Sequence, residues 1–275
     1  MRIGLSTPIV VQIPGVASPW ESTAGVAELV RVAETADALG FDHLTCAEHI
    51  GVPVEVAATR GVTYWDPLAT LSFLAAHTSR IRLATTVVVL GYHHPLALAK
   101  RYGTLDRLSG GRLVLGVGVG SLAEEFALLG AEWDKRGAVA DRTLAALRAA
   151  WGRREVDGFV VEPHAGSTTA TIWVGGRSRR SLHRAVESGS GWVPFGLSTR
   201  ALAEHLGTVD LPDGFEIVLN SGHALDPIGD PTGARDRLSR LRDIGATVAT
   251  CTVRASDIEH YCDQLAALHA LAEPL

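Results

Sequence analysis

The sequence has few cysteines and no excess of positive charge, and each shortage excludes a class of protein. Its three cysteines among 275 residues, Cys46, Cys251 and Cys262, are too few and too scattered for a disulfide framework or a zinc knuckle. The 25 basic and 30 acidic residues give a net charge of −5, without the basic face of a nucleic-acid binder. The composition therefore predicts a reducing, cytoplasmic location and no nucleic-acid partner.

Long apolar segments are also missing. No uninterrupted run of about 18 apolar residues occurs, so we expect no membrane-spanning helix. The polar and proline residues within positions 6–14 interrupt the amino-terminal apolar stretch, which therefore lacks the core of a secretion signal. Hydrophobic residues still make up 47% of the chain, enough to fill a sizeable core and to exclude disorder.

Short β-rich runs alternate with longer segments of helical period. Strands are expected at 3–7, 41–47, 81–87, 112–117, 171–174, 191–193, 215–219 and 247–252. Helices are expected at about 24–39, from 66 onward, and at about 94–108, 136–151, 178–187, 199–206, 231–243 and 257–271. Eight such units without a linker predict a single-domain (β/α)8 TIM barrel over residues 1–275, in preference to an open doubly wound sheet.

Barrel enzymes carry their chemistry on the loops that follow the strands. Glu48 and His49 follow the second strand, and because consecutive strand residues face opposite ways, only one of them is expected to point into the mouth. Tyr92, His93 and His94 follow the third strand and are the other candidate proton sources. The first strand ends at residues 6–8 without a His-x-His pattern, so no metal site is predicted.

A glycine run, GVGVGS at 116–121, follows the fourth strand. Its third glycine comes one residue too early for the dinucleotide fingerprint, and the unit is the fourth along the chain instead of the first. Either these glycines turn the chain out of the barrel, or the backbone closely approaches a flat ligand, which we favour. The residues expected at that ligand are Gly116, Gly118, Val119 and Gly120.

The segment of Gly175, Gly176, Arg177 and Ser178 joins the fifth strand to its helix. Amides at a helix start point outward and, with the helix dipole, form an anion site. Arg177 adds a charge and Ser178 a hydroxyl donor. We therefore expect a phosphate here, and the alternative is an ordinary glycine turn with a serine cap.

Together these motifs resemble the bacterial luciferase-like family. The resemblance is carried by residues 66–120 (DPLATLSFLAAHTSRIRLATTVVVLGYHHPLALAKRYGTLDRLSGGRLVLGVGVG) and by 172–192 (IWVGGRSRRSLHRAVESGSGW). The motifs AEHI at 47–50 and EEF at 124–126 fit as well, with Trp133 and Arg136 beyond them. The resemblance covers about residues 1–195, and the rest of the chain fits only as the remainder of a barrel.

The resemblance implies a barrel that binds the deazaflavin coenzyme F420 or FMN, commonly as a homodimer. In the F420 branch the residue corresponding to His49 often lies over the reactive ring. The bond between Thr86 and Val87 matches a non-proline cis peptide that buttresses the ring, and residues 175–178 correspond to a phosphate-binding segment. Ser121 stands where the F420-dependent sugar-phosphate dehydrogenases carry an acidic glutamate, so glucose-6-phosphate is not expected as the substrate.

The function expected from the sequence is therefore an F420-dependent oxidoreductase acting on a small organic molecule. The uncharged loop at 116–121 and the Glu48-His49 pair favour F420. His49 is expected to donate or relay a proton, and Glu48 either orients His49 or faces away. The alternatives are an FMN-dependent monooxygenase supplied by a separate reductase, and a flavin-binding barrel without catalysis.

Overall fold

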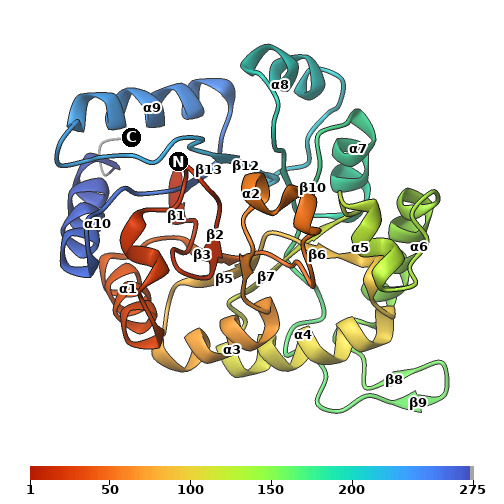
Figure 1. The fold of residues 1–275 in the computed structure, drawn as a ribbon. Coiled ribbons are helices and arrows are strands. Elements are labelled where there is room, and N and C mark those ends of the chain that lie inside the picture. Colours follow the sequence, from red (N-terminus) through yellow and green to blue (C-terminus); the bar gives the residue numbers. More distant parts are fainter. Residues whose placement is uncertain (273–275) are drawn as a thin grey trace.

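The eight expected strands close into a ring in the computed structural model, which describes residues 1–272 (Figure 1). In chain order they are β1 (Arg2–Leu5), β3 (His43–Cys46), β5 (Arg82–Thr85), β7 (Leu113–Gly118), β10 (Ile172–Gly175), β11 (Gly191–Val193), β12 (Glu216–Asn220) and β13 (Val248–Cys251). Neighbouring strands run parallel, and the last pairs with the first, with Arg2 opposite Val248 and Leu5 opposite Cys251. This closure confirms the (β/α)8 barrel and excludes an open sheet.

The helices cover the outside of the ring (Figure 1). They are α1 (Val26–Leu39), α3 (Pro67–His77), α4 (Pro95–Ser109), α6 (Arg136–Ala150), α7 (Arg179–Ser188), α8 (Thr199–Leu206), α9 (Pro231–Ile244) and α10 (Ile258–Ala272). Asp66 caps α3 by accepting a hydrogen bond from the Ala69 amide at 2.7 Å, and Gly40 ends α1 with a left-handed φ of 82°. Within residues 1–272, no helix has the length and apolar character needed to span a membrane.

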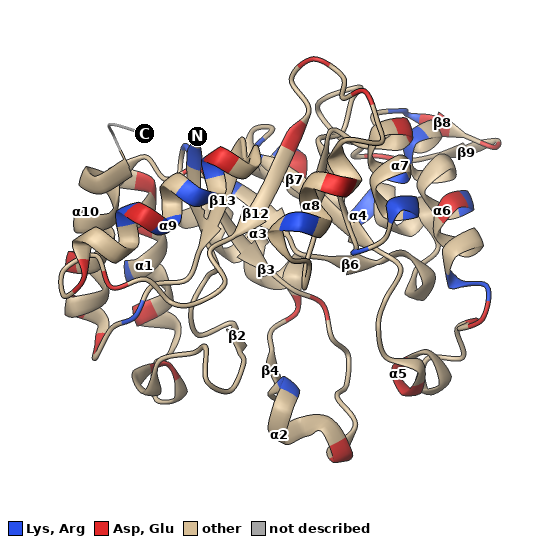
Figure 2. Cartoon of the chain, turned by 90° about the horizontal axis from the view of Figure 1, so that it is seen from above, with Lys and Arg blue, Asp and Glu red and all other residues tan. Residues whose placement is uncertain are grey.

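Short elements in the loops have too few residues for a periodic pattern to predict them. They are η1 (Pro19–Ser22), η2 (Val54–Val56), η3 (Leu90–Tyr92), α2 (Ala57–Arg60), α5 (Ala123–Leu128), β2 (Val11–Gln12) paired with β4 (Thr63–Tyr64), β8 (Glu155–Val156) paired with β9 (Phe159–Val160), and β6 (Val88–Val89) beside β7. Figure 2 shows β2, β4, α2 and α5 on one side of the barrel, with α2 projecting furthest. These elements follow the carboxyl ends of ring strands, so this side carries the mouth.

The other end of the barrel contains a buried charged cluster, the floor cluster of Asp42, Arg82, Trp173 and Glu216. The Glu216 carboxylate accepts hydrogen bonds from the Trp173 indole and from Arg82, which also pairs with Asp42 at 2.5 Å. Burial alone would raise the pKa of Asp42, but the hydrogen bond from His43 and the charge of Arg82 hold it well below its usual range. Because its residues lie at the starts of the strands, away from the mouth, we assign this cluster to stability.

Candidate active site

Predicted residues at the ends of β7 and β10 meet around the side chain of Val87, which follows β5. A Cβ atom on Gly118, at the end of β7, would lie 2.6 Å from Val87 Cγ2, and one on Gly175, at the end of β10, would lie 2.9 Å from Val87 Cγ1. The peptide bond between Thr86 and Val87 is cis, as the resemblance implies. Val87 is only half-buried, so part of it stays exposed at the mouth. We call Val87, Gly118 and Gly175 the Val87 seat.

The other glycines of the run at 116–121 also have close protein neighbours. A Cβ on Gly116 would lie 1.9 Å from the Thr85 carbonyl oxygen, and one on Gly120, whose φ is 79°, would lie 2.4 Å from the Phe126 ring. Packing within the protein therefore accounts for the absence of side chains here. A ligand contact at Gly116, Gly118, Val119 and Gly120 remains a prediction.

The Val87 seat can be tested by a double-mutant cycle. Gly118→Ala places a methyl group against Val87 and should lower the free energy of unfolding by about 1–3 kcal/mol, the typical cost of overpacking. In the Val87→Ala background the same change should cost much less, because the clashing methyl groups are gone. Urea denaturation of the wild type, both single variants and the double variant measures the coupling. Strictly additive effects would contradict the contact.

His49, in the loop after β3, is held by helix α5. Its Nδ1 lies 2.9 Å from Oε2 of Glu125, and its ring meets the Tyr64 ring edge-on, with centroids 4.5 Å apart. The His49 side chain is 16% exposed and that of Glu125 only 1%. Among the residues that the structure describes, 1–272, none makes a hydrogen bond to His49 Nε2. The imidazole is therefore fixed at one nitrogen and open at the other.

The Glu125 carboxylate accepts three further hydrogen bonds. The amides of Ile50 and Gly51 donate to Oε1 at 2.6 Å and 3.2 Å, and the Tyr92 hydroxyl donates to Oε2 at 3.0 Å. Burial, and then the hydrogen bond to Glu125, raise the pKa of Tyr92 far above its usual value, so the hydroxyl keeps its proton. In the sequence Glu125 is only part of the motif EEF, and no local pattern predicts its contact with a loop 76 residues away.

The Glu48 carboxylate contacts the loop after β5 and not the His49 ring. Its Oε1 lies 2.7 Å from Nε2 of His93, and its Oε2 accepts a hydrogen bond from the Val89 amide at 2.7 Å. The Glu48 side chain is buried beneath the loop after β5. Glu48 thus supports that loop, and the carboxylate that touches His49 is Glu125.

The segment 50–62, which contains η2 and α2, forms an arm in front of the ring in the view of Figure 1. At its base β4 pairs with β2, and a Cβ on Gly61, whose φ is 76°, would lie 2.0 Å from the Gln12 carbonyl oxygen. Arg60 donates a hydrogen bond to Ser121 Oγ at 3.3 Å, which links the arm to the loop after β7. The arm therefore crosses part of the mouth.

The predicted phosphate segment lies at the start of α7. Ser178 Oγ accepts a hydrogen bond from the Ser181 amide at 3.2 Å, so the serine does cap the helix, and both Ser178 and Arg177 are exposed. A Cβ on Gly176, whose φ is 145°, would lie 2.6 Å from Ser181 Cβ. The glycine turn and the exposed cation thus occur together, and phosphate binding stays a prediction.

Arg136 begins helix α6, which packs beside α7 through a hydrogen bond from Arg184 to the Gly137 carbonyl at 3.3 Å. Its guanidinium lies over the Trp133 ring, 3.7 Å from the centroid. Its Nε is buried and has no hydrogen-bond partner in the described part of the chain. Buried donors are normally paired, so an anion is a suitable acceptor for the hydrogen bond that this nitrogen lacks.

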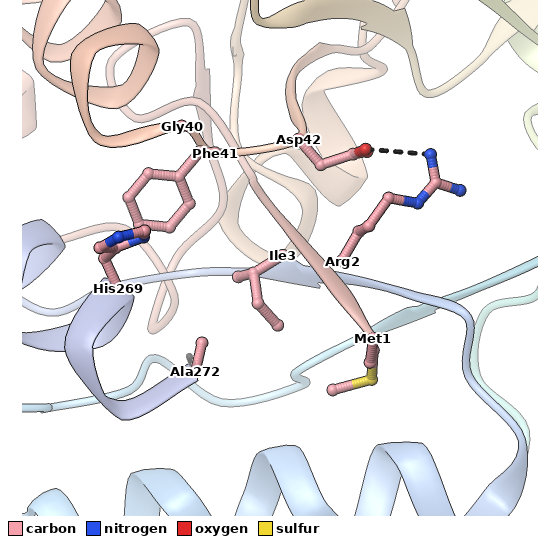
Figure 3. Close-up of a pocket in the computed structure, with 8 residues that line it drawn as sticks. All are labelled: Met1, Arg2, Ile3, Gly40, Phe41, Asp42, His269 and Ala272. Carbon is pink, nitrogen blue, oxygen red and sulfur yellow. Dashed lines mark hydrogen bonds and ion pairs between the residues drawn. The ribbon is translucent and has the colours of Figure 1, made fainter. Parts of the chain in front are cut away.

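A cavity of about 260 Å³ lies at the opposite end of the barrel and is separate from this site (Figure 3). Its lining residues are Met1, Arg2, Ile3, Gly40, Phe41, Asp42, His269 and Ala272. The ion pair of Arg2 with Asp42, at 3.1 Å, joins this cavity to the floor cluster. No predicted site residue lines the cavity, so we assign it no part in the chemistry.

Comparison with known sequences identifies relatives of the chain. A family profile described as luciferase-like monooxygenase matches residues 1–208. An uncharacterized protein of Mycobacterium tuberculosis is 36% identical over 135 residues, 45% of this chain and 48% of that protein. Limonene 1,2-monooxygenase of Rhodococcus erythropolis is 34% identical over 118 residues, 41% of this chain and 29% of that enzyme. The chain thus spans about half or less of the length of these relatives.

Solved structures share the fold at low sequence identity. Monooxygenase RslO1 from Streptomyces bottropensis superposes with a TM-score of 0.80 at 22% identity, covering 100% of this chain and 99% of that one. An F420-dependent secondary alcohol dehydrogenase with an F420–acetone adduct has a TM-score of 0.71 at 13% identity, covering 97% and 98%. The FMN-bound oxygenating constituent of 3,6-diketocamphane monooxygenase from Pseudomonas putida has a TM-score of 0.71 at 15% identity, covering 100% and 98%.

Proposed function

Because the chain belongs to the luciferase-like monooxygenase family, we propose that it is an oxidoreductase that transfers a hydride between F420 and a small organic substrate. The observation that carries this proposal is the imidazole of His49, held by the buried Glu125 at Nδ1 and open at Nε2. Hydride transfer to a carbonyl or an activated double bond also requires a proton. An imidazole titrates near neutrality and is suited to supply it.

The residues of the mouth fit a flat cofactor that carries a phosphate. The Val87 seat offers an uncharged surface on which a ring system would pack. Arg177 and Ser178 at the start of α7, and Arg136 with its unpartnered Nε, would hold the phosphate. When bound, F420 supplies the ring carbon that donates or accepts the hydride.

In the reductive direction His49 is the proton donor. The imidazolium gives its Nε2 proton to the substrate atom that becomes negative on gaining the hydride. It keeps the Nδ1 proton against Glu125 and takes a new Nε2 proton from solvent. Tyr64, edge-on to the ring, limits access of water to one side of the imidazole.

FMN-dependent monooxygenation with a separate flavin reductase is the second candidate function. It is favoured by the similarity to limonene 1,2-monooxygenase and by the shared fold with an FMN-bound monooxygenase. We prefer F420 because the loop at 116–121 carries no charged side chain and because His49 is open at a single nitrogen. The proposal also includes a cytoplasmic homodimer, and size-exclusion chromatography with light scattering tests the dimer.

Separate titrations of the purified protein with F420 and with FMN, followed by fluorescence, test the cofactor. We expect tighter binding of F420, and we expect Arg177→Ala to weaken it about 10-fold, as for the loss of one charge-assisted hydrogen bond. Arg200→Ala is the matched control, because Arg200 is an exposed arginine whose ion-pair partner is Glu204 on the same helix. Tighter binding of FMN would favour the monooxygenase, and binding of neither cofactor would refute both functions.

A further inference from the structure

We propose that Glu125 is a positioning residue that fixes the tautomer of His49, with the proton on Nδ1 and with Nε2 presented to the substrate. The catalytic part of this inference rests on the proposed function, in which His49 exchanges a proton with the substrate. The tautomer itself depends only on residues of this chain. The two parts can therefore fail separately.

The hydrogen bonds of Glu125 determine the direction of its bond to His49. Backbone amides can only donate, so the bonds from Ile50 and Gly51 make Oε1 an acceptor. The Tyr92 hydroxyl keeps its proton and donates to Oε2. With donors at both of its oxygens, the Glu125 carboxylate acts as an acceptor, so the remaining bond is His49 Nδ1–H donating to Oε2.

The position of Glu125 is itself fixed by packing. Helix α5 places Phe126 next to it with no exposed surface, and the Phe126 ring contacts Tyr92 at 4.8 Å and Trp133 at 5.3 Å between centroids. A side chain that is 1% exposed and hydrogen-bonded at both oxygens has no alternative position in solvent. The packing of α5 against the loop after β5 therefore determines the orientation of the imidazole.

This arrangement separates the two nitrogens of His49 by role. Nδ1 keeps its proton in both charge states, because Glu125 accepts from it in each. Only Nε2 gains and loses a proton during turnover, and it does so without rotation of the ring. Without the carboxylate, neutral His49 can place its single proton on either nitrogen, and the fraction protonated at Nε2 cannot accept a proton there.

Nitrogen NMR of the cofactor-free protein, labelled in its histidine rings, tests the tautomer. Wild-type neutral His49, assigned from His49→Ala, should show the Nδ1–H pattern of nitrogen shifts. Glu125→Gln should move these signals toward the mixed or Nε2–H pattern. Glu124→Gln is the matched control, since Glu124 is exposed on the same helix and its change removes the same charge.

Steady-state kinetics with oxidised F420 and cyclohexanol test the consequence, because in this direction neutral His49 must accept the substrate proton at Nε2. Glu125→Gln should lower kcat about 10- to 100-fold and change KM and F420 affinity much less, whereas Glu124→Gln should change none of these. A wild-type His49 with the Nε2–H pattern would overturn the assignment of the tautomer without any variant. Unchanged turnover in a folded Glu125→Gln protein, with turnover lost in His49→Ala, would overturn the positioning role. If the tautomer shifts as expected but His49→Ala keeps full turnover, the proposed function fails while the assignment of the tautomer stands.

Discussion

His49→Ala should lower turnover by about 10²–10⁴-fold, the usual contribution of a positioned general acid or base. The variant removes the open Nε2, which we propose as the proton donor. It leaves intact the Val87 seat and the start of α7, which we propose to hold the cofactor. Affinity for F420 should therefore change far less than turnover. Reoxidation of reduced F420 by cyclohexenone measures the first quantity, and fluorescence titration measures the second.

His93→Ala is the variant to compare with His49→Ala. His93 follows the next ring strand, and the sequence made it another candidate proton source. Its Nε2 is already occupied by the buried Glu48 at 2.7 Å. Removal of His93 leaves the buried Glu48 carboxylate without that partner, so the melting temperature should fall. Turnover per folded molecule should stay within a few-fold of the wild-type value. A large loss of turnover in His93→Ala, with His49→Ala near wild type, would reassign the proton source to His93.

The barrel could be predicted because each ring strand and covering helix leaves a signal in its own sequence. Asp66 before Pro67 marks the start of α3, and Gly40 marks the end of α1, and the structure places both where expected. The pair β2 and β4 leaves no such signal. Each strand has two residues, and their pairing depends on how two distant loops meet after the ring has closed.

The site could be predicted only in part, for the same reason. Alternation along a strand indicates that Glu48 and His49 face opposite ways, but not which carboxylate reaches the imidazole. That carboxylate comes from α5, a six-residue helix too short for a periodic pattern. The contact was therefore beyond local sequence reasoning, although its residue lay in a motif already noted.

The glycines give a second example of this limit. A sequence of small residues at a strand end indicates that there is no room for a Cβ, which is true at Gly118 and Gly175. It does not show what fills the space. In the structure it is the side chain of Val87, which lies between β5 and β6, and direct approach of the backbone to a ligand stays a prediction.

Glu216→Ala should lower the free energy of unfolding by about 3–5 kcal/mol, as expected when one partner of a buried ion pair is removed. The Glu216 side chain is 12% exposed and accepts hydrogen bonds from Trp173 and from two arginines, Arg2 and Arg82. Alanine would leave the buried Trp173 indole without its acceptor and would remove one of the two carboxylates that pair with Arg82. Urea denaturation at neutral pH measures the change.

Two further variants separate charge from hydrogen bonding. Glu216→Gln keeps an acceptor for Trp173 but removes the charge opposite the arginines, so its cost should fall between those of the wild type and Glu216→Ala. Glu204→Ala removes a carboxylate whose side chain is 56% exposed and should change stability by less than about 1 kcal/mol. If Glu216→Ala cost no more than Glu204→Ala, the floor cluster would not stabilise the barrel. Because the cluster lies at the starts of the strands, activity per folded molecule should be the same in all three variants.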